Sequence, residues 1–165
     1  MHGPFYSWLE NSSDEALKKS LIDAVHYVLA FTKTHGPFDG IYGFSTGALI
    51  ATLAVGIATD PNLQDKLLEI DELSELGSLD ESDFEESPFR FAVLACAGFR
   101  AKDMDTLRRI ASIPLPLNYY GGEDGDANLI ETKSFHLIGL EDHHKNKSEE
   151  IASLYKYSKI LYIPG

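Results

Sequence analysis

The sequence has very little cysteine and no long apolar run. Cys96 is the only cysteine, so an internal disulfide is impossible and disulfide-stapled secreted scaffolds are excluded. No stretch approaches the roughly 18 consecutive apolar residues of a membrane span. The start at Met1 lacks the basic end and apolar run of a signal peptide. We therefore expect a cytoplasmic protein with no membrane partner.

Positive charge is also scarce, since 14 Lys and Arg residues face 26 Asp and Glu residues, for a net charge of -12. Such a chain repels phosphates, so nucleic acid is not an expected partner. Between Asp60 and Glu86 there are eleven acidic residues and one basic residue, Lys66. We interpret 60–87 as an acidic insertion, either a solvated surface segment or a surface that docks a basic partner.

Apolar segments suited to strands and helices alternate along the rest of the chain. We expect helices over 13–35, 46–58 and 148–155, and strands over 38–44, 89–97, 134–139 and 159–163. Ser12 and Glu15 form a capping-box pattern for the first helix, and Gly36 is expected to end it in a left-handed conformation. Strands separated by helices are parallel with right-handed crossovers. The prediction is a single α/β domain over 1–165, with a doubly wound, mostly parallel sheet.

The segment Gly43-Phe44-Ser45-Thr46-Gly47 is a G-x-S-x-G motif between an expected strand and an expected helix. A sharp strand-to-helix turn strains the serine backbone and presents its hydroxyl above the sheet. We expect Gly43 and Gly47 to avoid clashes at this turn. Ser45 is thus the candidate nucleophile, and the backbone N–H of Thr46 at the helix N-terminus is a candidate oxyanion donor.

A serine nucleophile needs a histidine base and a carboxylate that orients it, which in this type of fold follow in the order Ser, acid, His. Asp142, after the expected strand 134–139, is the candidate acid, and Glu141 is a weaker one. A helix-capping role for Asp142 is the alternative. The acid–histidine cluster Asp142, His143 and His144 has no recognised metal-ligand spacing, so no metal or cofactor is expected.

A histidine after the last expected strand is missing, because that strand is followed only by Pro164 and Gly165. His143 and His144 are not expected to act, because a residue so close to Asp142 can hardly take its orienting bond and also reach Ser45. His136 lies within a strand, where a core role is expected. The other histidines lie too early in the chain: His2, His26 and His35.

Three segments together resemble the FSH family of serine hydrolases, which includes the ovarian cancer-associated gene 2 protein. They are 36–48 around the Ser45 motif, Phe91-Ala92-Val93-Leu94 leading to Gly98-Phe99-Arg100, and 132–139 with Asp142. The resemblance implies a partial α/β-hydrolase fold, an acyl ester or thioester substrate, Ser45 as nucleophile and Asp142 as triad acid. The family usually has Gln where Thr46 stands. Its first-strand oxyanion loop and its closing Gly-His segment have no counterpart between Met1 and Gly165.

These observations lead us to expect a domain of the carboxylesterase or thioesterase type with low or no activity in this chain. The rival hypothesis is a catalytically silent interaction module that docks a partner through the acidic segment. Sheet edges left unpaired would favour self-association.

Overall fold

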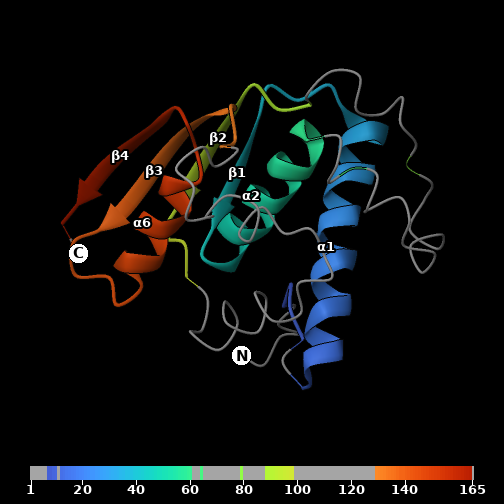
Figure 1. The fold of residues 1–165 in the computed structure, drawn as a ribbon, viewed down its shortest axis with the longest axis horizontal. Coiled ribbons are helices and arrows are strands. Elements are labelled where there is room, and N and C mark those ends of the chain that lie inside the picture. The colour runs from blue at the N-terminus through green and yellow to red at the C-terminus, as the bar shows by residue number, and fades with distance from the viewer. Residues whose placement is uncertain are drawn as a thin grey trace, which may run out of the picture.

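The computed structural model describes residues 7–10, 12–60, 64, 79, 88–98 and 129–164. Its elements follow the order α1 (Asp14–His35), β1 (Gly40–Phe44), α2 (Thr46–Thr59), β2 (Phe91–Ala95), β3 (Lys133–Gly139), α6 (Lys145–Ser153) and β4 (Ser158–Ile163) (Figure 1). The predicted strands and helices are all present. The most displaced boundary is the start of α6, three residues before the predicted start. Most of the acidic segment lies outside the described residues.

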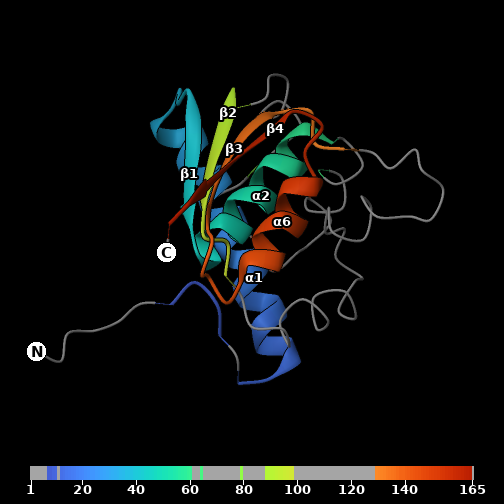
Figure 2. The ribbon, with the colours of Figure 1, turned by 90° about the vertical axis from the view of Figure 1, so that its left-hand side faces the viewer.

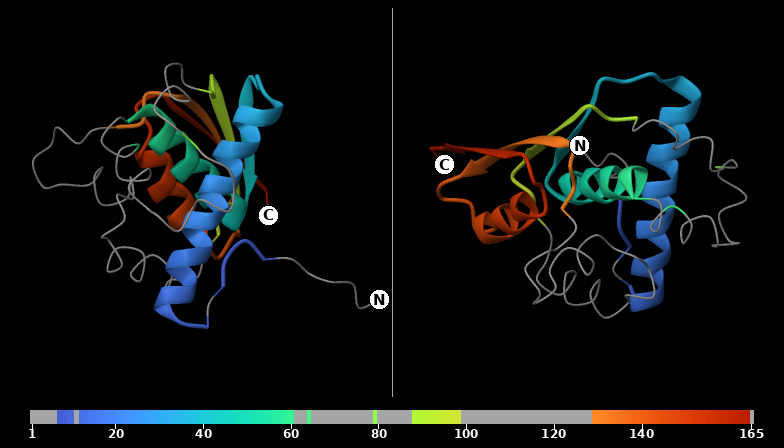
Figure 3. Two further views of the ribbon diagram at one scale, coloured as in Figure 1. Left: turned by 90° about the vertical axis from the view of Figure 1, so that its right-hand side faces the viewer. Right: turned by 45° about the horizontal axis from the view of Figure 1, so that its top comes forward.

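The four strands form one parallel sheet in the order β1-β2-β3-β4. Figure 2 and Figure 3 show α2 and α6 on the same face of this sheet, with α1 beside α2 at the β1 end. Because all four strands run the same way, their carboxyl ends lie along one edge. The β1–α2 and β3–α6 turns therefore lie along this carboxyl edge, as the parallel α/β prediction requires.

The first helix ends at the predicted residue, but its N-cap and the conformation that follows its end differ from the prediction. Ser13 is the N-cap, and its hydroxyl accepts a hydrogen bond from the Ala16 N–H at 3.1 Å, whereas the Ser12 hydroxyl donates to Glu10. Gly36 ends the helix in an extended conformation (φ -69°, ψ -176°), so the prediction of a left-handed conformation at Gly36 was wrong. The Gly36 N–H still closes the last turn by donating to the Thr32 carbonyl at 2.8 Å.

Helix α2 is the centre of the core. All residues from Ala48 to Ala58 are buried, and Leu49, Leu53 and Val55 have no exposed surface. Glycine and alanine occupy six of the fourteen positions and let the helix lie close to both β1 and α1. Its amino end is consequently held firmly at the end of β1.

None of the helices among the described residues is both long and apolar enough to cross a bilayer.

The sheet face opposite α2 and α6 carries no helix among the described residues. Successive side chains of a strand point to opposite faces, so the buried Ala92, Leu94 and His136 face the helices while Phe91 and Phe135 face outward. Tyr42, Phe44 and Leu161 on this outer face are 65%, 60% and 51% exposed. A doubly wound sheet, as predicted, carries helices on both faces, and the described part of the chain places them on one face (Figure 2 and Figure 3).

Candidate active site

The backbone of Ser45 is strained at the junction of β1 and α2. Its φ of 54° and ψ of -124° lie in a region that residues with a side chain rarely adopt. The Ser45 N–H donates to the Ala95 carbonyl at 3.0 Å, which ties the turn to the end of β2. This is the tight strand-to-helix turn that the G-x-S-x-G motif predicts.

Gly43 is required by this turn for a steric reason. A methyl group on Gly43 would lie 2.5 Å from the Gly47 carbonyl oxygen and 2.6 Å from the Ala48 Cα, which are backbone atoms that cannot move aside. A methyl group on Gly47 would have Trp8 Nε1 as its nearest neighbour, at 3.9 Å. The predicted steric role is confirmed for Gly43, whereas nothing in the described structure requires a glycine at position 47.

The Ser45 hydroxyl is half-buried at the carboxyl edge of the sheet. It donates to the Gly98 carbonyl at 3.4 Å, and the Thr46 hydroxyl donates to the same carbonyl at 3.3 Å. Thr46 is the first residue of α2, whose first turn has no acidic residue. The first N–H groups of a helix have no carbonyl partner within it and carry partial positive charge, so this helix end suits a developing oxyanion.

Asp142 lies in the turn between β3 and α6, on the same carboxyl edge. Its carboxylate accepts the backbone N–H of His144 at 2.8 Å, and its backbone N–H donates to the Gly139 carbonyl at 3.2 Å. The carboxylate therefore closes a local turn just before α6, whose N-cap residue is His144 and whose first turn receives no side-chain cap bond. Glu141 is exposed in the same turn. Among the described residues, neither carboxylate forms a hydrogen bond with a histidine ring.

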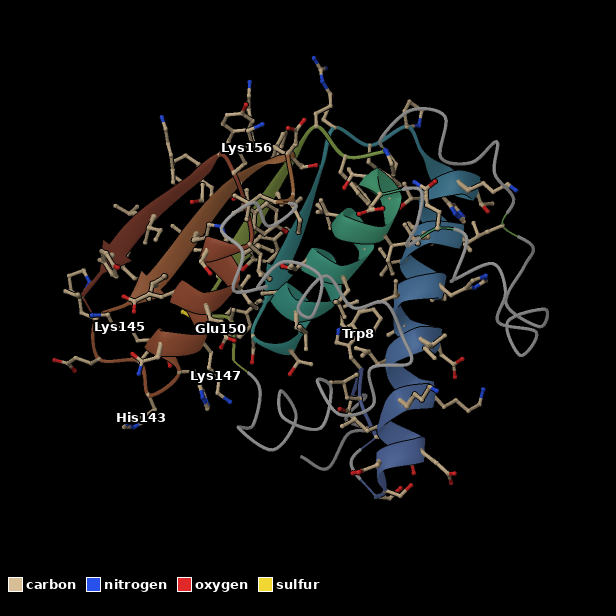
Figure 4. The ribbon with its side chains drawn as sticks, viewed as in Figure 1. Trp8, His143, Lys145, Lys147, Glu150 and Lys156 are labelled. Atoms are coloured by element: carbon tan, nitrogen blue, oxygen red, sulfur yellow. The ribbon has the colours of Figure 1, made fainter. Side chains whose placement is uncertain are left out.

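Three of the histidines can be assigned from their surroundings. His136 is 2% exposed, its Nε2 lies 2.8 Å from the Ser134 hydroxyl, and burial lowers its pKa to about 4. It is a core residue, as predicted. His26 is also buried, and its pKa is lowered by burial, with Asp23 opposing the shift. His143 points away from the body of the protein into solvent (Figure 4).

His144 occupies a position that the sequence did not suggest. A methyl group on Gly98 would lie 3.2 Å from His144 Cδ2 and 3.3 Å from Ser45 Oγ. The imidazole of His144 and the hydroxyl of Ser45 therefore border the same small space, with only Gly98 between them. The one available signal was a glycine directly after a buried strand, and that signal does not identify a histidine 46 positions later.

A cavity of about 540 Å³ lies on the β1 side of the turn. Its lining includes Gly43, Phe44 and Gly47, and aromatic side chains such as Trp8 and Phe31 form much of its wall. Ser45 itself is not among the lining residues. Within the described ranges, no three His, Cys, Asp or Glu side chains are grouped closely enough to hold a metal ion.

A serine on a strained turn between a parallel strand and a buried helix, with a carboxylate from a later strand on the same edge, is the arrangement expected of a serine hydrolase of the α/β-hydrolase type. The model of the FSH1 serine hydrolase family matches residues 1–165. The chain therefore belongs to this family, as its resemblance predicted.

Two curated relatives are similar over most of this chain. An uncharacterized hydrolase of Schizosaccharomyces pombe is 29% identical over 135 residues, which are 82% of this chain and 28% of the relative. A rhodanese-like domain-containing protein of Arabidopsis thaliana is 32% identical over 128 residues, 76% of this chain and 17% of the relative. The chain thus spans less than a third of either relative. No solved structure matches it.

Proposed function

We propose that this serine hydrolase domain cleaves carboxylic esters or thioesters through an acyl-enzyme formed on Ser45. The observation that carries the proposal is the backbone of Ser45, whose φ of 54° holds a half-buried hydroxyl at the end of a buried helix. Strain of this kind persists only where the surrounding structure enforces it, and it is concentrated at functional sites. The single cysteine, Cys96, supports a reducing compartment such as the cytoplasm.

The chemistry requires one attack and one hydrolysis. Ser45 Oγ adds to the acyl carbon, the carbonyl oxygen becomes an oxyanion at the amino end of α2, and the alcohol or thiol leaves. Water then releases the acid and restores the serine. The apolar cavity beside Gly43 and Phe44 supports an apolar acyl group as the preferred substrate.

We expect turnover by these 165 residues to be slow. Asp142 gives its carboxylate to a backbone N–H, and the Ser45 hydroxyl donates to a carbonyl. In a complete triad the carboxylate holds the imidazole in the productive orientation, and loss of that function alone lowers kcat by roughly 10⁴-fold. A similar deficit is expected here.

Covalent labelling with a fluorophosphonate tests the proposal directly, because the reagent reports an activated serine even where turnover is slow. The parent chain should be labelled at Ser45, as found by peptide mass spectrometry, and Ser45→Ala should not be labelled. The exposed Ser12→Ala is the matched control and should be labelled like the parent. A parent chain that resists the reagent, or labelling that survives in Ser45→Ala, would contradict the proposal.

A silent interaction module is the second candidate, favoured by the exposed aromatic side chains of the outer sheet face. Tyr42 and Phe44 are more than half exposed on β1, whose outer edge pairs with no strand among the described residues. Such surfaces promote self-association or partner binding. Under this alternative, light scattering would show a dimer or larger species while Ser45 stayed unlabelled.

A further inference from the structure

The carbonyl oxygen of Gly98 accepts hydrogen bonds from two neighbouring hydroxyl groups at the amino end of α2. Ser45 Oγ donates to it at 3.4 Å, and Thr46 Oγ1 donates to it at 3.3 Å. Gly98 itself is buried. A carbonyl oxygen has two lone pairs, so it accepts both bonds at the same time. The nucleophile of the proposed reaction therefore shares its acceptor with the side chain of the next residue.

The reaction affects the two donors differently. When Ser45 Oγ bonds to the acyl carbon, its proton ends on the leaving alcohol or thiol, and the ester oxygen has no hydrogen to donate. The Thr46 hydroxyl keeps its proton at every step. A buried acceptor that loses its donor raises the free energy of that state. The bond from Thr46 therefore keeps the Gly98 carbonyl paired at the stage when the bond from Ser45 is lost.

The Gly98 carbonyl cannot simply turn away from the serine, because the backbone before it is fixed. The Cys96 N–H donates to the β3 backbone at 2.8 Å, and the Ala97 carbonyl accepts the Ser148 hydroxyl at 3.3 Å. A methyl group on Gly98 would lie 3.3 Å from Ser45 Oγ, so this backbone lies close to the nucleophile. An unpaired carbonyl here would stay buried beside the reacting oxygen.

The Thr46 hydroxyl is held in a defined direction. Threonine is branched at Cβ, which restricts the rotation of its side chain. Thr46 is the first residue of α2, and the N-cap residue Ser45 makes no side-chain hydrogen bond to the helix. The Ser45 side chain therefore does not occupy the first N–H groups of α2, where the oxyanion is proposed to form.

From these contacts we infer that the Thr46 side chain is a positioning residue for Ser45, an inference that rests on the proposed function. Its hydroxyl acts through the Gly98 carbonyl and is separate from the backbone N–H proposed as an oxyanion donor. Because the bond from Ser45 is present before the attack and absent after it, the Thr46 hydroxyl matters most in the transition state. Removing the hydroxyl lowers the rate of the chemical step and leaves binding unchanged.

Fluorophosphonate labelling at a series of reagent concentrations separates the two quantities. Ser45 Oγ attacks phosphorus and loses its proton as it does with an acyl carbon, and fluoride leaves. Thr46→Val preserves the shape of the side chain and removes the hydroxyl. We expect its maximal labelling rate to fall by about fivefold or more, with the half-saturating concentration changed by less than about twofold. Thr46→Ser keeps a hydroxyl and should recover most of this loss.

The control is Thr59→Val at the other end of α2. The Thr59 hydroxyl bonds to the Val55 and Gly56 carbonyls of its own helix at 2.9 and 3.2 Å, so this variant should be labelled at the parent rate. Thermal unfolding shows whether each variant is folded. Thr46→Ala is a second variant without the hydroxyl, and it should show the same fall in rate if Thr46→Val is unstable.

Three results would overturn the inference and leave the role of Ser45 intact. They are an unchanged maximal rate in Thr46→Val, a loss in Thr46→Ser as large as that in Thr46→Val, and a change confined to the half-saturating concentration, which would place the side chain in binding. If the parent itself is not labelled at Ser45, the proposed function fails, and this inference fails with it.

Discussion

The two strand-to-helix turns on the carboxyl edge of the sheet are built in opposite ways. The β1–α2 turn is short and strained, and it leads into a helix that is buried from Ala48 to Ala58. The β3–α6 turn is longer and polar, is closed by a hydrogen bond from the His144 N–H to the Asp142 carboxylate, and leads into a helix with three buried residues. Rigid apolar packing keeps the strained backbone of Ser45 in place, whereas local hydrogen bonds position the Asp142 carboxylate. The following changes test that contrast.

Gly43→Ala should have the largest effect, because it breaks the strained turn. The added methyl group would meet backbone atoms of Gly47 and Ala48 at 2.5 to 2.6 Å. Overpacking against a fixed backbone costs about 1–3 kcal/mol or more. We expect a loss of about 3 kcal/mol in chemical denaturation, with lost Ser45 labelling. An unchanged unfolding midpoint would show that the turn is not rigid.

A pH titration of stability should show that the β3–α6 unit contains a buried titratable group. The folded state lowers the pKa of His136 to about 4 by burial, while the unfolded chain binds a proton below the ordinary value of 6.5. Stability is therefore complete above pH 6.5 and falls as the pH approaches 4, by up to about 3 kcal/mol. The buried His26 contributes in the same direction.

The check is the unfolding free energy of the parent and His136→Gln from pH 7.5 to 4. The variant should lose much of the parent's decline in this range, although it can be less stable at pH 7.5 because the Ser134 bond changes. Equal slopes in the parent and His136→Gln would refute the assignment.

Asp142→Ala should have a moderate effect, because it removes the acceptor for the His144 N–H. A single intramolecular hydrogen bond typically contributes about 1 kcal/mol to stability. We expect a loss of this size in thermal unfolding as the β3–α6 turn loosens. The matched control is Glu141→Ala in the same turn, for which a change within about 0.5 kcal/mol is expected. Equal effects of the two variants would argue against a stabilising role for the bond between the His144 N–H and the Asp142 carboxylate.

Gly47→Ala should have the smallest effect and a favourable sign. The methyl group meets nothing closer than Trp8 Nε1 at 3.9 Å, and alanine is favoured over glycine within a helix by roughly 0.5–1 kcal/mol. A modest rise in the unfolding midpoint, compared with the large fall for Gly43→Ala, would show that the two motif glycines have different roles. A fall of similar size would make them equivalent.

The sequence predicted the parts of the fold that depend on local patterns. Local sequence patterns were enough to predict the apolar strands, the buried helix α2 and the turn at Ser45, because each depends on neighbouring residues. The start of α6 was predicted too late, since Lys145-Asn146-Lys147 has no apolar periodicity and the first turn forms through backbone bonds to the His144 carbonyl. Gly36 was predicted to be left-handed from its residue type alone, yet its backbone is extended.

The relation between Ser45 and His144 could not be predicted, because it depends on three segments meeting at one edge. Gly98 must follow β2 closely enough to border the serine, and Ser148 must hold the first turn of α6 against Ala97. Neither distance is encoded by spacing along the chain. Sequence reasoning located Asp142 correctly on this edge, but not the group to which its carboxylate bonds.

The sheet face that carries no helix among the described residues has a practical consequence for enzymology with this protein. Aromatic and aliphatic side chains such as Tyr42, Phe44 and Leu161 project from it with more than half of their surface in water. Molecules that adhere through this face become more numerous as the solution is concentrated, since association follows mass action. If the chain self-associates through this face, as we propose, rates measured for the serine should vary with enzyme concentration, and a dilution series tests this.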